Sequence, residues 1–342
     1  MKELCIDIRM AFSSGIGTYI RNLITGLKAG PFKLRLIADP TTLERWPLLS
    51  TFDLILCRAP IYSIEEQIRL PLLIPTCDLF WSPHYNVPLL PIRAKKRMVT
   101  IHDVYHLAHR DKLSLPKRLY ANLLIPQAAK RSDRVITVSQ FSKNELLNYV
   151  ALAEESVEVI SLGVDRTHFC PRNGHKQEKY LLFVGNLSPH KNIQGLLHSL
   201  SYLKDKTWKV VVVGAKTRGH IPLKDPFGQA VFLENVETEE LPALYRGAYA
   251  LVHPSFYEGF GLTPLEAMSC GCPVIASNAA SLPEVCGDAA LYIDPHRPES
   301  IAKAIEELAP IRETMIAKGL ERANQFGWDK TIERHIQIIE SL

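Results

Sequence analysis

The chain has 342 residues, more than one domain usually contains, so two domains with separate hydrophobic cores are expected. With 46% hydrophobic and 22% charged residues, it has the composition of a folded globular protein, which excludes a largely disordered chain. The net charge of +4 is too small to indicate a nucleic-acid partner, and because no apolar run reaches about eighteen residues, no membrane-spanning helix is predicted.

Strand-like and helix-like segments alternate along the chain, which predicts an α/β fold with doubly wound parallel sheets. The first series of strands is predicted at residues 2–10, 34–38, 53–57, 78–82, 98–102, 134–138 and 157–162. A polar stretch at residues 167–179, which contains Pro171 and Gly174, is interpreted as a linker. The second series is predicted at residues 180–184, 210–214, 230–233, 248–252, 273–276 and 291–293.

The two series define two Rossmann-like domains, at residues 1–168 and 175–327. A final helix, predicted at about 328–342, is expected to pack back on the first domain. The sequence begins Met-Lys-Glu and continues into a strand, without the layout of a signal peptide, and its seven cysteines are scattered through apolar contexts. Free thiols and a cytoplasmic location are therefore expected.

Gly15 and Gly17 lie in the predicted turn between the first strand and the helix that follows it. Two glycines at this place would fit the start of a dinucleotide-binding fingerprint, and Asp39 ends the second strand at about the expected distance. Ile20 occupies the position of the third glycine, where a large side chain would crowd the helix against the strand. Two interpretations therefore stay open: a nicotinamide-binding loop and a simple tight turn.

The stretch H-P-S-F-Y-E-G-F-G-L-T-P-L-E-A-M-S-C-G joins a short buried strand to a helix. Thr263 is predicted to cap this helix, with Glu266 at capping-box spacing. Gly259 and Gly261 leave bare backbone in the turn, and the first free N–H groups of the helix suit a phosphate. Glu258 and Glu266 bracket the turn, with seven residues between them. By themselves, these carboxylates would also fit a solvated loop residue and a helix cap.

Residues 258–277, E-G-F-G-L-T-P-L-E-A-M-S-C-G-C-P-V-I-A-S, resemble the Glu-x7-Glu signature of retaining glycosyltransferases of family 4. Enzymes of that family have the GT-B fold of two Rossmann-like domains, and the resemblance implies the same fold here. It also implies that Glu258 lies beside the donor sugar and that Glu266 holds the ribose of the nucleotide. The donor is expected to approach the backbone of the turn, at Gly259, Phe260, Gly261 and Leu262.

His102 lies in the motif T-I-H-D-V at the carboxyl end of a predicted strand, where open α/β sheets bind their ligands. A lone histidine is more often structural, but a His-Asp pair at a strand end also resembles the family's motif. The resemblance implies that His102 reaches the donor sugar, and Asp103 is a candidate for orienting the ring. The turn at Gly15 and Gly17 also resembles the glycine-rich loop that approaches the donor phosphates in that family.

Residues 183–192, F-V-G-N-L-S-P-H-K-N, resemble the diphosphate-binding loop of the same family. Lys191 matches the lysine that neutralises the donor phosphates, and the alternative is a plain surface lysine. Many members carry an arginine where this chain has Asn186, which can donate a hydrogen bond but no charge. His190 or a group of the first domain would then have to supply a second cation. Val236 follows a strand where the family's backbone meets the nucleobase.

Together these motifs imply retaining transfer of a hexose from a nucleotide-diphosphate sugar to a glycan or lipid-linked glycan. Mannose, from GDP-mannose, is the first expectation for the sugar. Glu258, His102 and Lys191 are the expected catalytic residues. Because the chain contains no Asp-x-Asp motif, no metal ion is expected, and no other cofactor. Two alternatives stay open: an NAD-dependent dehydrogenase and a catalytically silent GT-B partner subunit.

Residues 93–134 contain eleven basic and three acidic residues, the strongest local charge in the chain. Within this segment, Leu119, Leu123 and Leu124 have roughly helical spacing, and Pro126 is expected to kink or split the helix. Core packing beside a solvated face is the ordinary explanation. The alternative is a peripheral contact with anionic membrane lipid, for which the candidate charges are Lys117, Arg118, Lys130 and Arg131.

Overall fold

The computed structural model describes residues 1–112, 114–172, 178–214, 223–225 and 227–342, apart from the side chains of Lys112, Pro116 and Lys117. These residues form two compact units. The first unit comprises Met1–Leu162 and Trp328–Leu342, and the second comprises Gly163–Gly327. Gly174 of the predicted linker lies outside the described residues.

The sheet of the first unit contains the strands β1 Lys2–Asp7, β2 Phe32–Ala38, β3 Asp53–Leu56, β4 Cys77–Ser82, β5 Ala94–Thr100, β6 Arg134–Thr137 and β7 Val157–Val159. All neighbouring strands are parallel, and their order is β3-β2-β1-β4-β5-β6-β7. From β1 to β3 successive strands are added toward one edge of the sheet, and from β4 to β7 they are added toward the other edge. The point between β1 and β4 is therefore the switch point, where doubly wound sheets bind ligands at the carboxyl ends of their strands.

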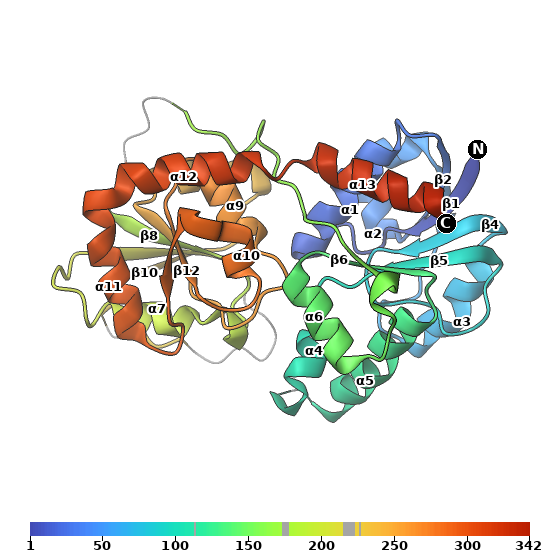
Figure 1. Cartoon of the computed structure of the whole chain (residues 1–342), viewed down its shortest axis with the longest axis horizontal. Coiled ribbons are helices and arrows are strands. Elements are labelled where there is room, and N and C mark those ends of the chain that lie inside the picture. Colours follow the sequence, from blue (N-terminus) through green and yellow to red (C-terminus); the bar gives the residue numbers. More distant parts are fainter. Residues whose placement is uncertain (113, 173–177, 215–222, 226) are drawn as a thin grey trace. The chain divides into compact units, whose positions relative to one another are not determined.

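The helices of the first unit are α1 Ser14–Leu27, α2 Pro40–Arg45, α3 Ile64–Leu73, α4 Tyr105–Ala108, α5 Leu115–Lys130, α6 Gln140–Tyr149 and α13 Trp328–Ser341. Figure 1 shows α13, in red, beside α1, in blue. Gly26 permits this close packing, because a Cβ there would lie 2.1 Å from Cδ1 of Ile332. The buried Tyr19 hydroxyl lies 2.8 Å from Nε2 of His335. The first unit is thus completed by the last helix of the sequence.

The sheet of the second unit contains β8 Tyr180–Val184, β9 Lys209–Val213, β10 Ala230–Leu233, β11 Ala250–His253, β12 Val274–Ser277 and β13 Ala290–Ile293. These strands are also parallel, in the order β10-β9-β8-β11-β12-β13. β8 and β9 are almost continuously apolar, as expected for parallel strands that are covered on both faces. The switch point of this sheet lies between β8 and β11.

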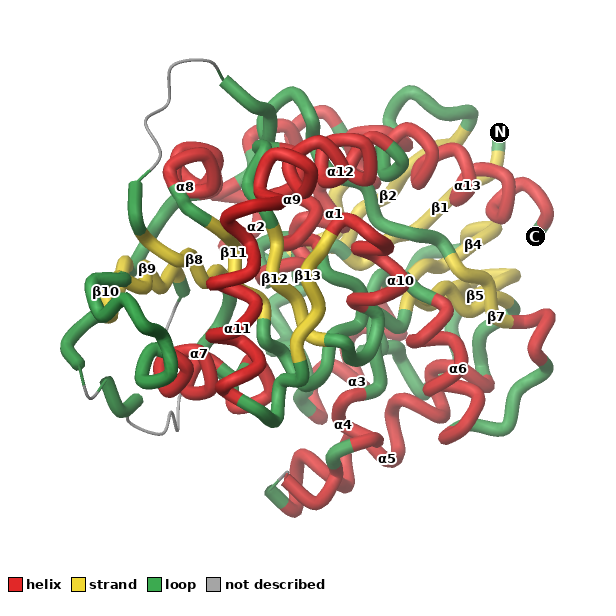
Figure 2. The backbone as a smooth tube through the Cα atoms, turned by 60° about the vertical axis from the view of Figure 1, so that its left-hand side comes forward, coloured by secondary structure: helices red, strands yellow, loops and turns green. Residues whose placement is uncertain are grey.

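The helices of the second unit are α7 Ile193–Ser199, α8 Leu241–Gly247, α9 Leu262–Ser269, α10 Leu282–Cys286, α11 Pro298–Leu308 and α12 Arg312–Asn324. Figure 2 shows α8 and α9 on one face of the sheet and α7 and α11 on the other. α12 packs on the outside of α9, where a Cβ on Gly319 would lie 3.2 Å from Cγ of Met268. α9, which follows the switch point, is therefore held from outside. No helix in the described parts of the chain is long and apolar enough to cross a bilayer.

Each run predicted as a strand forms one, and the α/β class is confirmed. One difference concerns β5, which begins four residues before its predicted start at residue 98. Its first half contains Lys95 and Lys96, which give it the composition of a loop. Both lysines form ion pairs across the sheet, with Asp78 at 2.7 Å and Asp133 at 2.8 Å. In the first half of β5, ion pairs with neighbouring segments therefore accompany strand pairing where the alternation of apolar residues is missing.

Candidate active site

Glu258 lies in the loop between β11 and α9, at the carboxyl edge of the second sheet. Its Oε1 accepts hydrogen bonds from Lys191 Nζ at 2.6 Å, His253 Nε2 at 2.7 Å and Ser255 Oγ at 2.8 Å. The Glu258 side chain is 11% exposed and that of Lys191 is 17% exposed. The alternative interpretations of a solvated loop carboxylate and a plain surface lysine are therefore wrong.

The surroundings of Glu258 favour its ionised form. Burial by itself would stabilise the neutral acid, but the charges of Lys191 and His253 and their hydrogen bonds outweigh it, so the pKa of Glu258 lies well below its usual value. All three side-chain hydrogen bonds reach Oε1, and Oε2 has no partner among the residues that the structure describes. The site thus presents an ionised carboxylate with one saturated oxygen and one available oxygen.

The loop after Glu258 is anchored at two points. The Ser281 hydroxyl donates to the carbonyl oxygens of Glu258, at 3.0 Å, and Phe260, at 2.6 Å. The Phe260 ring is 5% exposed and packs edge-on against Phe326. The Phe260 ring is therefore a packing residue, so the donor contact that the resemblance implies for Phe260 would fall to its backbone.

Helix α9 begins earlier than the sequence predicts. Its N-cap is Gly261, with a φ of 124°, and Leu262 is the first helical residue. Thr263 is therefore the second residue of the helix, and the prediction that it caps the helix is wrong. The reason is that glycine adopts a positive φ at little cost and so allows the chain to turn into the helix two residues sooner. The free N–H groups of this first turn lie directly after the Glu258 loop.

Glu266, in the middle of α9, has a different environment from Glu258. The hydroxyl of Tyr245, which is fully buried, donates to Oε2 of Glu266 at 2.9 Å. Burial raises the pKa of Glu266 to about 7, and the Tyr245 hydrogen bond offsets only part of this effect. At neutral pH one signature carboxylate is thus ionised while the other is poised between its two protonation states, a difference set by their surroundings.

Lys191 ends the short 3-10 helix Pro189–Lys191, in the loop between β8 and α7. Asn192 follows it with a φ of 56°, and its Nδ2 donates to the carbonyl oxygens of Pro254, at 3.1 Å, and Pro295, at 2.7 Å. The first of these bonds ties the Lys191 loop to the loop after β11. It explains why two segments far apart in sequence bring a lysine and a carboxylate together.

Asn186 stands in the same loop, directly after β8. Its Oδ1 accepts the N–H of Ser188 at 3.3 Å, so its Nδ2 remains a donor for a ligand. Next to it the backbone is packed very closely: a Cβ on Gly214 would lie 1.9 Å from the carbonyl oxygen of Gly185. Only glycine can therefore occupy position 214 at the end of β9.

Val236 borders a cavity of about 550 Å³ at the carboxyl end of β10. This volume lies within the usual range for small-molecule sites. The cavity is lined by Phe232, Leu233, Glu234, Asn235, Val236, Glu240, Ala243 and Leu244. Its position is compatible with the predicted contact between Val236 and a nucleobase.

In the first unit, His102 lies just after β5, near the switch point. Its Nε2 is 3.0 Å from the carbonyl oxygen of Pro83, and because a carbonyl can only accept, Nε2 carries the proton. Burial lowers the pKa of His102, despite the Pro83 bond, so the ring is neutral at neutral pH. Asp103 instead accepts the N–H of Tyr105 at 2.9 Å. Pro83, and not Asp103, therefore orients the Nε2 edge of the ring.

The two glycines after β1 have separate surroundings. Gly15 has open space where a Cβ would stand, whereas a Cβ on Gly17 would lie 2.5 Å from the carbonyl oxygen of Ala11. Gly17 thus allows α1 to pack against the preceding turn. Asp39, the acidic residue of the dinucleotide interpretation, caps α2 by accepting the N–H of Thr42 at 2.7 Å. Its carboxylate is therefore used locally.

The structure brings some of the predicted site residues into contact and shows two further residues that bind Glu258. Glu258 and Lys191 are in direct contact in the second unit, whereas His102, Gly15 and Gly17 belong to the first. His253 and Ser255, which hold Glu258, were assigned no role in the sequence, although the run H-P-S directly after a strand offered two hydrogen-bonding side chains. Across the described ranges, no three His, Cys, Asp or Glu residues are grouped as metal ligands would be.

Comparisons with known proteins cover both units. Residues 13–168 match the family described as Glycosyltransferase Family 4, and residues 165–319 match Glycosyl transferases group 1. The chain is 30% identical over 286 residues to the O-antigen chain mannosyltransferase B of Escherichia coli, covering 74% of this chain and 72% of that protein. It is also 30% identical to the O-antigen chain mannosyltransferase RfbU of Salmonella typhimurium, covering 72% and 69%.

Solved structures show the same fold. Sucrose-phosphate synthase from Thermosynechococcus elongatus aligns with a TM-score of 0.77 at 18% identity, over 100% of this chain and 99% of that one. Anabaena Alr3699/HepE in complex with UDP and glucose aligns with a TM-score of 0.77 at 16% identity, over all of both chains. The family matches on both units decide against a nicotinamide dehydrogenase. The chain belongs to glycosyltransferase family 4 and is a glycosyltransferase with the GT-B fold that its sequence resemblance implied.

Proposed function

We propose that the chain transfers a mannosyl group from GDP-mannose to a saccharide acceptor, with retention at the anomeric carbon and without a metal ion. The observation that carries the proposal is the contact between Lys191 and the ionised Glu258, directly before the first N–H groups of α9. Mannose is supported by the names of the two O-antigen relatives. A nucleotide diphosphate as the carrier is supported by the complex of HepE with UDP and glucose.

Lys191 and the start of α9 would stabilise the leaving diphosphate. In the free protein the ammonium group of Lys191 is 2.6 Å from Glu258, and an incoming diphosphate would share or take over this charge. The unpaired N–H groups of α9 add hydrogen bonds and the positive end of the helix dipole. Such fixed donors stabilise the charge that develops on the diphosphate as its bond to the sugar breaks.

The other residues would position the donor and balance the reaction. The available Oε2 of Glu258 suits a hydroxyl of the donor sugar, and Glu266, once ionised, would accept the ribose hydroxyls. Neutral His102 offers Nδ1 as an acceptor, because its proton is on Nε2. In retaining transfer, the acceptor oxygen bonds to the anomeric carbon on the face that the phosphate leaves, and a phosphate oxygen takes the acceptor's proton.

A thermal-shift panel tests the donor. GDP and GDP-mannose should stabilise the protein more than the matched uridine, adenosine and thymidine compounds, by about 2.7 kcal/mol at a hundred times the dissociation constant. Selective stabilisation by a uridine compound would refute GDP-mannose as the donor. Proton NMR of the product reports retention, and excess EDTA should leave the rate unchanged. A silent partner subunit would bind GDP-mannose but release no GDP when offered saccharide acceptors.

We further propose that α5 touches an anionic membrane surface. Leu124 is buried, but Leu115, Leu119 and Leu123 are 67%, 61% and 53% exposed, one turn apart along the helix. Leu119 and Leu123 therefore do not share the core position of Leu124, which argues against the explanation of core packing for the whole stripe. Of the kink or split expected at Pro126, a split does not occur, because α5 continues through this residue. Arg118, Lys130 and Arg131 are all exposed, and the guanidinium group of Arg131 also donates to Gln127.

The charges and the apolar row on α5 should act together. Each basic side chain near anionic lipid contributes on the order of 1 kcal/mol, and this attraction is screened within about a Debye length. The protein should therefore sediment with phosphatidylglycerol vesicles at low salt and be released at high salt. Replacing Lys117, Arg118, Lys130 and Arg131 with Gln should abolish sedimentation, and L119S with L123S should weaken it even at low salt. If the protein does not bind these vesicles even at low salt, the membrane proposal is wrong and a water-soluble acceptor is the better interpretation.

A further inference from the structure

Tyr62 occupies an unusual position at the carboxyl edge of the first sheet, in the loop between β3 and α3. Its φ is 64°, in the left-handed region, and 42% of the residue is exposed. A bulky residue in this conformation is strained, and such strain persists only where the surroundings impose it, often at ligand sites. Glycine or asparagine would fill this backbone position at lower cost, so the aromatic ring itself needs an explanation.

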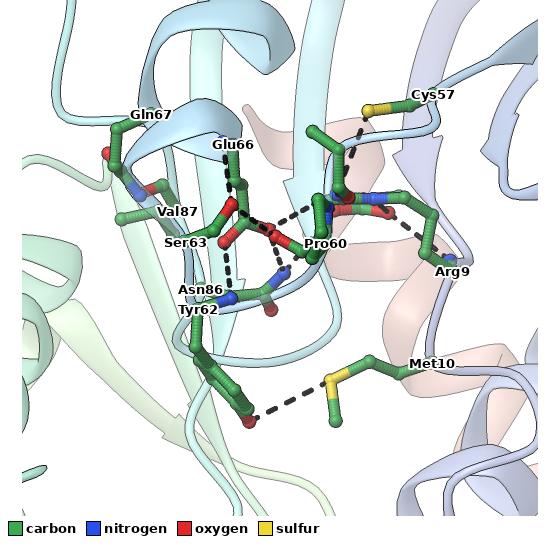
Figure 3. A network of polar contacts seen from close by, with 12 residues as sticks. Arg9, Met10, Cys57, Pro60, Tyr62, Ser63, Glu66, Gln67, Asn86 and Val87 are labelled. Carbon is green, nitrogen blue, oxygen red and sulfur yellow. Dashed lines mark hydrogen bonds and ion pairs between the residues drawn. The ribbon is translucent and has the colours of Figure 1, made fainter.

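A buried ionic network contacts the backbone of Tyr62; Figure 3 shows its members Arg9, Glu66 and Asn86 together with Tyr62. Oε2 of Glu66 accepts the Tyr62 N–H at 2.8 Å. Oε1 of Glu66 accepts from Arg9 Nη2 at 2.6 Å and from Asn86 Nδ2 at 3.1 Å. Arg9 also binds both oxygens of Asp7, at 2.9 Å and 2.6 Å. The Arg9 and Glu66 side chains are fully buried, so this network is a rigid support behind the loop.

The Tyr62 ring is held by its neighbours. It stacks on Tyr85 with a centroid distance of 5.8 Å and an interplanar angle of 28°, and it meets Tyr120 edge-on at 5.7 Å. Its hydroxyl is 2.6 Å from Nε2 of His84. Nδ1 of His84, which is 93% buried by residue, has no hydrogen-bond partner within the described part of the chain. The cluster is thus pre-arranged, partly exposed and still has hydrogen-bonding capacity.

We propose that Tyr62 is the platform on which a sugar ring of the acceptor stacks, and that Glu66 and Arg9 are positioning residues that hold it there. This inference rests on the proposed glycosyl transfer, since it concerns the second substrate of that reaction. The apolar face of a pyranose presents C–H groups with partial positive charge, which the negative face of an aromatic ring attracts. Because the ring is already fixed, little side-chain entropy is lost when the sugar binds.

The nature of the support favours this role over a purely structural one. A tyrosine that only completed the core would be buried, whereas Tyr62 is exposed to nearly half of its surface. Its position after β3, near His84 and the residues that follow β1 and β4, is the part of the sheet where ligands bind. Tyr62 therefore combines a strained backbone, a buried network that supports it and an exposed side chain, at the edge of the sheet where ligands bind.

The test uses saturation-transfer NMR on the full chain with methyl α-D-mannoside, methyl α-D-glucoside, methyl α-D-galactoside and methyl N-acetyl-α-D-glucosaminide as probes. At least one glycoside should bind the unmodified protein, and Tyr62→Ala should weaken its binding about tenfold, the scale of one lost aromatic contact. Tyr62→Phe should keep most of the affinity. Tyr149→Ala is the control, because Tyr149 is 46% exposed on the same unit, at the end of α6.

Equal glycoside binding by Tyr62→Ala and the unmodified chain would overturn the proposal, and so would the absence of binding by all four probes. GDP-mannose binding, measured in parallel by thermal shift, separates this failure from a failure of the proposed function. Glu66→Gln tests the support: an amide cannot accept from both Tyr62 and Arg9, so acceptor KM should rise while donor affinity stays unchanged. If acceptor KM is unchanged in a folded Glu66→Gln protein, Glu66 is not a positioning residue.

Discussion

Replacing Glu258 by glutamine should damage stability and catalysis together. The substitution keeps the size of the side chain but removes the charge that pairs with Lys191 at 2.6 Å, on the oxygen that also accepts from His253 at 2.7 Å. A glutamine oxygen in the place of Oε1 could still accept from the three donors, with the amide nitrogen in the place of Oε2, so the main loss is the negative charge. The structure therefore predicts that the loss of the carboxylate leaves a mostly buried ammonium group without its anionic partner.

The magnitude follows from burial. Breaking a fully buried ion pair costs about 3–5 kcal/mol, and because Glu258 and Lys191 retain 11% and 17% exposure, about 2–4 kcal/mol is expected here. For a unit of this size the melting temperature should fall by roughly 4–16 °C. Turnover should fall at least about a hundredfold, the scale of one lost electrostatic contact.

Differential scanning calorimetry and GDP release from GDP-mannose measure the two effects. The pKa of Glu258 is depressed in the folded state, so its stabilising contribution is present above the unfolded pKa and is lost as the pH falls below about 4. The stability gap between the two proteins should therefore narrow in acid. Glu313→Gln, at a side chain that is 88% exposed, should change neither quantity. A Glu258→Gln protein with unchanged melting and full turnover would refute the reasoning.

Three further predictions concern the same unit. Because the pKa of Glu266 is raised to about 7, GDP affinity should increase from about pH 6 to about pH 8 in calorimetric titrations, and Glu266→Gln should reduce this dependence to the part that comes from the terminal phosphate of GDP, which ionises at about pH 6; a flat profile in the unmodified protein would contradict the assignment. Lys191→Met should weaken GDP binding at least about tenfold, and an unchanged affinity would show that the lysine does not meet the diphosphate. Gly214→Ala should unfold the second unit at lower temperature, since its Cβ would lie 1.9 Å from a carbonyl oxygen; a normal melting curve would contradict the close approach.

The sequence predicted much of this molecule because its signals are local. Apolar runs mark the strands, and the Glu-x7-Glu spacing identifies the family and indicates Glu258 and Glu266 as candidate site residues. Two kinds of information were not visible. The contact between Lys191 and Glu258 depends on Asn192, whose amide donates to a carbonyl 62 residues away in sequence. The exposure of Leu119 and Leu123 depends on which face of α5 meets the sheet, which spacing alone does not determine.

The support of Tyr62 was hidden for the same reason. Arg9, Glu66 and Asn86 come from three separate segments, and each alone looks like an ordinary polar residue. Only the folded chain shows that they form one buried network. Charged residues are rarely fully buried without a partner, so a sequence offers no way to recognise them as interior. Each family motif, in contrast, lies within one short continuous stretch of the chain, so it can be recognised from the sequence alone.

The return of the chain to its first unit has a consequence for biosynthesis. Residues 163–327 form a unit of their own, whereas α1 receives its partner helix only when residues 328–341 leave the ribosome. Until then the face of α1 that contains Tyr19 and Gly26 has no helix packed on it, and Tyr19 cannot form its hydrogen bond with His335. The second unit can therefore finish folding before the first, so the order of folding reverses the order of synthesis. A nascent chain paused near residue 327 would expose this apolar face to chaperones.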